Sequence, residues 1–164
     1  MKTTKKARSS KFGNKVSALY RSKLEQTCAS LLAEHSVPFF YERIKLNLID
    51  SFKFSSVERV GKTFKAVESV RSMSYTPDFV GSHWVIETKG MKTPDFLIKW
   101  KLFKNYLLTH QLTPLLFMPT NKKEILTSIE HILDTEESAR CKRFNAWLHT
   151  NITDNDNRRR VQNN

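Results

Sequence analysis

The chain has 164 residues, of which 39% are hydrophobic, so one domain can bury a core without disulfides or a structural metal. Its net charge of +12 makes nucleic acid the expected partner, ahead of an anionic membrane or solubility alone. The polar, basic start and the lack of a long apolar run argue against a secretory signal and a transmembrane helix. The two cysteines form no C-x-x-C pair and the five histidines have no ligand-like spacing, which favours a reducing cytoplasm and no zinc site.

Basic residues dominate the start of the chain, where the first acid is Glu25. A segment with charge of one sign repels itself, so residues 1–15 are predicted to be a flexible basic arm. The arm is either a solvated tail or a phosphate-contacting surface, and we favour the second. The residues expected to contact nucleic acid are Lys5, Lys6, Arg8, Lys11, Lys15 and Arg21, together with Lys99 and Lys101 from a later helix.

Apolar residues at helical spacing predict a first helix over residues 16–35, with Glu25 at the edge of its buried face. Val37-Pro38 is expected to end it. The strand-like stretches that follow are residues 39–50, a β-hairpin over residues 51–72, and two short strands over residues 73–80 and 83–88. Turn signals at Gly61-Lys62 and Gly81-Ser82 define the two hairpins.

A helix is predicted over residues 94–110 by a stripe of apolar residues. The stripe consists of Phe96, Trp100, Phe103 and Leu107, widened by Leu97 and Leu108. A short buried strand over residues 114–118 and a helix over residues 121–133 follow, the latter with Asn121 as its cap and Glu124 at capping-box spacing.

The folded domain is therefore expected over residues 16–134, followed by a polar, partly helical tail over residues 135–164. The order of elements predicts a small α/β sandwich around a mixed sheet. That order is helix, strand, hairpin, two strands, helix, strand and helix.

The tetrapeptide TPDF occurs twice, at residues 76–79 and 93–96. In the second copy, Thr93, Pro94 and Asp95 suit the N-cap, N1 and N2 positions of the following helix, so Asp95 is interpreted as structural. No helix follows the first copy, which lies within a strand.

Asp78 of the first copy is followed by Glu87 and Lys89 on the next strand. Alternate residues of a strand share a face, so Glu87 and Lys89 are expected to project together, with Asp78 folded back beside them. The plain alternative is an exposed Glu87–Lys89 ion pair, which contributes only about 0–1 kcal/mol. Charges among apolar neighbours are costly, however, and two close carboxylates repel unless a cation lies between them.

Pro77-Asp78 and Glu87-Thr88-Lys89 resemble the signature of the PD-(D/E)XK nuclease superfamily. Together with YRSKLEQ (20–26) and FFYER (39–43), the segments YTPDF and WVIETKG are similar to phage endonuclease I, the family that resolves Holliday junctions. The likeness extends from about residue 20 to residue 90.

The resemblance implies a restriction-endonuclease-like core, in the order α-β-β-β-α-β with a β-hairpin insertion, that hydrolyses phosphodiester bonds with Mg²⁺ or with Mn²⁺ in its place. It implies that Asp78 and Glu87 are metal ligands, and that Lys89 orients water or stabilises the transition state. It also implies that Glu25 completes the metal site, within one chain or across a homodimer, and that Thr88 contributes its backbone carbonyl. The implied substrate is branched or nicked DNA, and a phage-encoded chain would work in the bacterial host's cytoplasm.

Two features differ from the family: the insertion at residues 51–72, and the sequence after Gly90. Both bear on substrate preference.

Two alternatives stay open. One is a restriction-like or transposition-linked DNA cutter that relies on a partner for specificity. The other is a non-catalytic nucleic-acid-binding or virion-packaged protein of the same fold.

Overall fold

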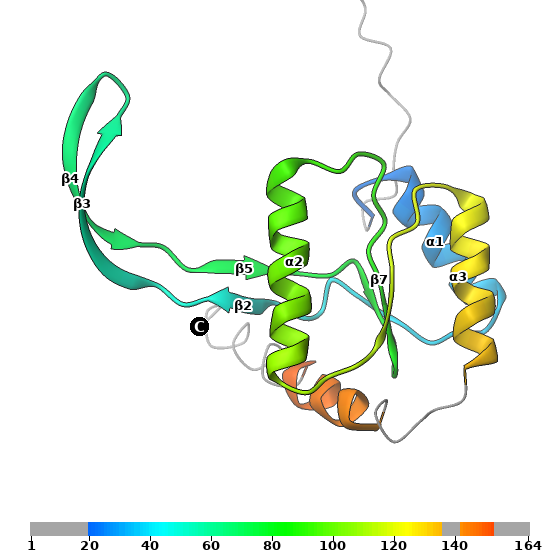
Figure 1. Cartoon of the computed structure of the whole chain (residues 1–164). Coiled ribbons are helices and arrows are strands. Elements are labelled where there is room, and N and C mark those ends of the chain that lie inside the picture. Colours follow the sequence, from blue (N-terminus) through cyan, green and yellow to red (C-terminus); the bar gives the residue numbers. More distant parts are fainter. Residues whose placement is uncertain (1–19, 136–141, 153–164) are drawn as a thin grey trace, which may run out of the picture.

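The computed structural model describes residues 20–135 and 142–152, which form a mixed α/β fold (Figure 1). A four-stranded sheet lies at its centre, in the order β1 (Phe40–Tyr41), β6 (Phe79–Val80), β7 (Trp84–Ile86) and β8 (Leu115–Phe117). The β7–β8 pair is parallel and the other neighbouring pairs are antiparallel. The predicted mixed sheet is therefore confirmed.

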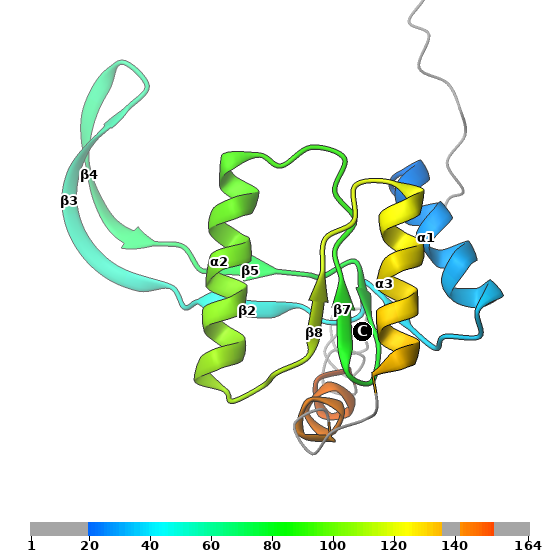
Figure 2. The same cartoon turned by 45° about the vertical axis from the view of Figure 1, so that its right-hand side comes forward.

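Helices cover both faces of this sheet, as Figures 1 and 2 show from two directions. Helices α1 (Lys23–Glu34) and α3 (Lys122–Asp134) lie side by side on one face, and α2 (Pro94–Thr109) lies on the other. Each face has its own apolar core, so the strands that carry the candidate site are held from both sides.

Local capping explains where the helices begin. The α2 helix starts at Pro94 because the Thr93 hydroxyl accepts the Phe96 N–H at 3.3 Å, as predicted. The Asn121 cap of α3 is also confirmed, with its side chain 3.0 Å from the Glu124 nitrogen. The first helix begins at Lys23, after a Ser22 cap, and so starts later than expected.

The single strand predicted over residues 39–50 is wrong, because it is two strands. Between β1 and β2 (Leu46–Ile49), Glu42 adopts a left-handed φ of 45° and its N–H donates to the Asp78 carbonyl at 2.9 Å. This turn away from extended geometry ends β1, and β2 pairs instead with β5 (Met73–Tyr75). The predicted strand over residues 73–80 is likewise divided, into β5 and β6.

The hairpin expected over residues 51–72 is confirmed as β3 (Phe52–Val60) and β4 (Thr63–Val70), joined at Gly61-Lys62. The tight connection between β6 and β7 is confirmed as well. Gly81 is required there, since a Cβ at this position would lie 2.2 Å from the Trp84 ring.

The core continues beyond residue 134, where we placed the end of the folded domain. Residues 142–152 form a fourth helix, and its Phe144 and Leu148 are each 1% exposed in the core beside α2. On α2, the predicted stripe of Phe96, Trp100, Phe103 and Leu107 is buried. The predicted widening of that stripe is wrong, since Leu97 is 41% and Leu108 74% exposed.

Within the described ranges, no helix is long and apolar enough to cross a membrane. The arm at residues 1–15, with Lys5, Lys6, Arg8, Lys11 and Lys15, lies outside those ranges. The last part of the expected tail, residues 153–164, lies outside them too.

Candidate active site

Asp78 and Glu87 meet where β6 and β7 leave the central sheet. The Asp78 N–H donates to Glu87 Oε2 at 3.3 Å, so the turn folds the first TPDF copy back beside Glu87, as the sequence predicts. Glu87 is only 3% exposed. The arrangement is therefore a largely desolvated carboxylate pair at the end of an antiparallel strand pair.

Lys89 lies beside this pair. Its Nζ is 3.1 Å from Glu87 Oε1 and 4.3 Å from the centroid of the Phe96 ring, at the start of α2. The predicted shared face of Glu87 and Lys89 is confirmed. Because the Glu87 side chain is buried while that of Lys89 is 31% exposed, the pair is not the surface ion pair of the plain alternative.

Thr88 holds Asp78 in place. Its backbone N–H and its hydroxyl both donate to Asp78 Oδ2, each at 2.8 Å. We expected only the Thr88 backbone carbonyl to matter, so this use of the side chain was missed. Among the described residues, Asp78 Oδ1 receives no hydrogen bond, which leaves that oxygen for a ligand.

Tyr75 fixes Glu87 from β5, a strand of the separate two-stranded sheet β2–β5. Its hydroxyl donates to Glu87 Oε2 at 2.7 Å, and the hydrogen bond raises the pKa of Tyr75, with burial as the larger cause. Tyr75 was not among the predicted site residues. Its closeness to the TPDF motif was the available signal, but the sequence alone does not show that the phenol reaches Glu87.

Both carboxyl groups are harder to ionise than isolated ones. Burial, reinforced by the negative charge of Glu87, raises the pKa of Asp78 to about 7, against the opposing hydrogen bonds from Thr88. Burial also raises the pKa of Glu87, although Tyr75 and Lys89 stabilise its anion. Such a pair gains from a bound cation, which would relieve both desolvation and repulsion.

Glu25 lies apart from this pair but affects it. It is 8% exposed on α1, and its Oε2 accepts the Tyr41 hydroxyl at 2.6 Å and the Arg21 N–H at 2.9 Å. Burial alone would raise the pKa of Glu25, yet the hydrogen bonds from Tyr41, Ser22 and Arg21 lower it overall. Its negative charge contributes to the raised pKa of Asp78.

The described part of the chain contains no cluster of three or more His, Cys, Asp or Glu side chains arranged to hold a metal ion. The structure therefore brings Asp78 and Glu87 together and does not add Glu25 as a third ligand. Cys28 is buried near Asp78, and burial raises the pKa of its thiol to about 12, in keeping with an unreactive cysteine.

The described basic candidates lie in two different layers. Arg21 precedes α1, is 77% exposed and pairs with Glu42 at 2.9 Å. Lys99 and Lys101 lie on α2, across the sheet from α1 (Figure 2), with Lys101 exposed and Lys99 half-buried. The structure does not gather these three into one patch.

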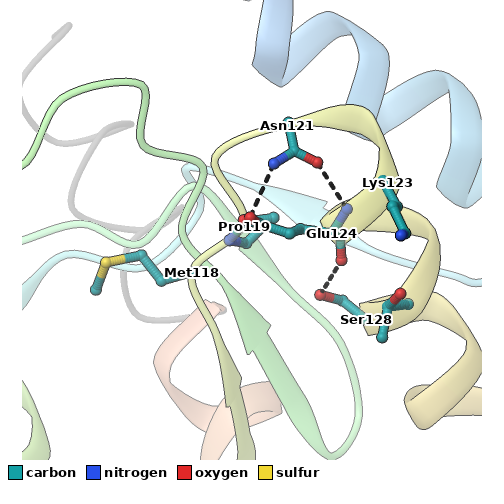
Figure 3. Close-up of a pocket in the computed structure, with 7 residues that line it drawn as sticks. Met118, Pro119, Asn121, Lys123, Glu124 and Ser128 are labelled. Atoms are coloured by element: carbon teal, nitrogen blue, oxygen red, sulfur yellow. Dashed lines mark hydrogen bonds between the residues drawn. The ribbon is translucent and has the colours of Figure 1, made fainter.

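A hollow of about 440 Å³ lies at the start of α3 (Figure 3). It is lined by Met118, Pro119, Asn121, Lys123, Glu124, Thr127 and Ser128. The helix start is already capped, because Asn121 accepts the Glu124 N–H and Glu124 accepts the Thr120 N–H at 2.7 Å. The Glu124 carboxylate therefore occupies the position where an anion would need a hydrogen-bond donor. The hollow is for this reason a poor site for an anionic substrate.

The second TPDF copy is part of a helix start and not of the candidate site. Asp95 is exposed in the first turn of α2, behind the Thr93 cap.

Comparison of the chain with models of known families, with curated proteins and with solved structures gave no match.

Proposed function

We propose that this chain is a Mg²⁺-dependent DNA endonuclease with a restriction-endonuclease-like core, similar to the phage endonuclease I family. One observation supports this most: the half-buried Asp78 beside the buried Glu87, with Lys89 3.1 Å from Glu87, at the end of an antiparallel strand pair. A purely structural ion pair would need one acid, and the second acid adds a repulsion that a bound cation would relieve.

The donor set fits Mg²⁺. This ion prefers hard oxygen ligands and is usually held by one or two carboxylates, with water and substrate phosphate completing its coordination. Asp78, Glu87 and the Thr88 carbonyl would hold it, and Mn²⁺ would substitute. When bound, the ion supplies Lewis-acid chemistry: it neutralises phosphate charge and makes water more acidic.

The chain's own residues position these groups. Thr88 orients Asp78 through two hydrogen bonds, and Tyr75 orients Glu87 from β5. Lys89 places a compact positive charge at the rim of the site, where it stabilises the extra negative charge that a phosphodiester gains during hydrolysis. No Ser or Cys nucleophile is required, since water attacks directly.

Glu25 acts on the site through its charge in the single chain. It is 8% exposed and hydrogen bonded to Tyr41, so its carboxylate is held near Asp78 without joining a ligand cluster. In the proposed enzyme, Glu25 becomes a ligand only if substrate or a second chain rearranges the site.

DNA is the substrate proposed from charge, since a net charge of +12 attracts a polyanion and accelerates its capture. The sequence contains no recognition-helix motif or zinc-finger motif, which favours recognition of DNA shape, such as branches and nicks.

The test is cleavage of a labelled four-way junction, a linear duplex with the same arms, and a supercoiled plasmid. Cleavage with Mg²⁺ that stops in EDTA, with the junction preferred, supports the proposal. Mg²⁺-dependent cleavage of all three at equal rates indicates a cutter whose specificity comes from a partner. Binding without any cleavage indicates the non-catalytic alternative.

A further inference from the structure

The β3–β4 hairpin extends from the body of the molecule as a curved ribbon (Figure 1). None of its residues belongs to either described core cluster. An isolated two-stranded hairpin is at best marginally stable in water, so a hairpin of nine and eight residues per strand gains from a partner.

One face of the hairpin is largely apolar, although Arg59 and Glu68 also lie on it. Residues directly opposite in an antiparallel pair share a face. The pairs on this face are Phe52–Val70, Val57–Ala66 and Arg59–Phe64. The exposed fractions are 49% for Phe52, 73% for Val57 and 73% for Phe64. Phe54, two residues beyond Phe52 where the register shifts, is 62% exposed.

The opposite face is mainly polar. Its pairs are Lys53–Ser69, Ser56–Val67, Glu58–Lys65 and Val60–Thr63. Five cations lie on or beside the hairpin, against the two acids Glu58 and Glu68; the cations are Lys53, Arg59, Lys62, Lys65 and Arg71, all exposed. The hairpin as a whole therefore carries a net positive charge, and Arg59 lies directly opposite Phe64 on the aromatic face.

Exposed aromatic rings next to cations are the combination that binds single-stranded nucleic acid, because bases stack on the rings and phosphates pair with the cations. The nine residues of β3 span about 30 Å at ~3.3 Å per residue, which is the length of several nucleotides. The hairpin is also continuous with the candidate site, since β4 leads into β5, whose Tyr75 binds Glu87.

We propose that the β3–β4 hairpin is a binding arm for unpaired DNA, in which bases stack on Phe54 and Phe64. This inference rests on the proposed function only for the choice of DNA as the polymer. It gives that site a substrate class: DNA with a single-stranded stretch beside the cleaved bond.

A second copy of the chain is the competing occupant of this face. Packing two such faces together would bring together two hairpins that each have five cations and two acids, with one cation, Arg59, and one acid, Glu68, in each largely apolar face. A second copy adds repulsion between two positively charged hairpins, whereas a polyanion neutralises their charge. Charge therefore favours DNA as the occupant of this face.

The experiment measures binding of a labelled single-stranded oligonucleotide and of a duplex of equal length, by fluorescence anisotropy in EDTA. Phe54→Ala/Phe64→Ala removes the rings, and Phe54→Leu/Phe64→Leu keeps apolar area without an aromatic face. Val60→Ala, on the opposite face, is the matched control. We expect both double variants to bind the single strand at least tenfold more weakly, with duplex binding within twofold and Val60→Ala unchanged.

Three outcomes would overturn the inference: single-strand binding unchanged in the Ala variant, full binding retained in the Leu variant, or equal loss for single strand and duplex. Light scattering on the same variants tests for a second copy. A parent dimer that becomes a monomer in the Ala variant, without selective loss of single-strand binding, identifies a self-association surface instead. The binding assay contains no metal, so it does not depend on cleavage. A protein that does not cleave junctions can still bind the single strand through the hairpin, and each proposal can therefore be rejected without the other.

Discussion

Asp78 is the residue on which the proposed chemistry most depends, and its raised pKa also links it to stability. The pKa rises from an ordinary value of 3.8 to about 7 because the carboxyl is buried beside Glu87. Between those two pH values the folded chain keeps a proton that the unfolded chain has lost. Ionisation therefore opposes folding, and this contribution to stability falls as pH rises from about 4 to 7.

The pH prediction follows from that sign. In EDTA, the melting temperature of the parent should fall relative to that of Asp78→Asn as the pH rises from about 5 to 8. A relative loss of about 1 kcal/mol corresponds to roughly 2–4 °C in a protein of this size. Differential scanning calorimetry of both proteins measures the difference. A gap that stays constant with pH, or that grows in favour of the parent, would mean that folding does not raise the pKa of Asp78.

Lys89 is predicted to act as a compact charge. Lys89→Ala should lower the cleavage rate by about 100-fold or more, comparable to removing one electrostatic stabiliser from an active site, while the Mg²⁺ concentration for half-activity changes little. Lys89→Arg should restore little, because a planar guanidinium does not reproduce the ammonium 3.1 Å from Glu87.

Lys122→Ala, an exposed lysine at the start of α3, is the control for Lys89 and should keep parental activity. Parental rates in Lys89→Arg would show that only diffuse positive charge is needed there.

At the scale of elements, the C-terminal helix at residues 142–152 belongs to the fold. Phe144 is 1% exposed in the core beside α2, so Phe144→Ala should lower the free energy of unfolding by about 3–5 kcal/mol. Lys142→Ala, on the exposed side of the same helix, should change it by less than about 0.5 kcal/mol. Urea titration monitored by circular dichroism measures both. Equal urea midpoints for Phe144→Ala and Lys142→Ala would mean that this helix does not belong to the cooperatively unfolding core.

Elements fixed by local chemistry could be predicted from the sequence. Thr93 and Asn121 cap their helices as expected, and Gly61-Lys62 joins the predicted hairpin. The meeting of Asp78, Glu87 and Lys89 was also predictable, because a short turn and strand alternation suffice to bring them together.

Features that depend on distant partners could not be predicted. The break at Glu42 needs the Asp78 carbonyl, which is distant in sequence. Tyr75, on the strand β5 that pairs with β2, donates to Glu87, which lies 12 residues away in sequence. The burial of Phe144 was missed because the polar residues around it hid an apolar stripe of only a few residues.

At the scale of the whole molecule, positive charge is expected to dominate DNA affinity. Deleting residues 1–15 removes Lys2, Lys5, Lys6, Arg8, Lys11 and Lys15. The slope of log affinity against log salt should become shallower by about 0.9 for each phosphate that the arm neutralises in the parent, while turnover at saturating DNA stays close to parental. Anisotropy titrations over about 50–200 mM salt measure the slope. An identical slope in the truncated chain would mean that the arm binds no phosphate.

The two TPDF copies provide the most direct test of the nuclease proposal. Each contains one aspartate followed by phenylalanine, but Asp78 faces Glu87 while Asp95 is exposed at the start of α2. The measurement is the rate of four-way-junction cleavage by Asp78→Asn and Asp95→Asn over a Mg²⁺ titration. We predict that Asp78→Asn retains less than about 1% of the parental rate, a barrier increase of more than ~2.7 kcal/mol, while Asp95→Asn stays near parental at every Mg²⁺ concentration. Substantial cleavage by Asp78→Asn would contradict the nuclease proposal, and loss of activity in both variants would instead contradict the structural interpretation of Asp95.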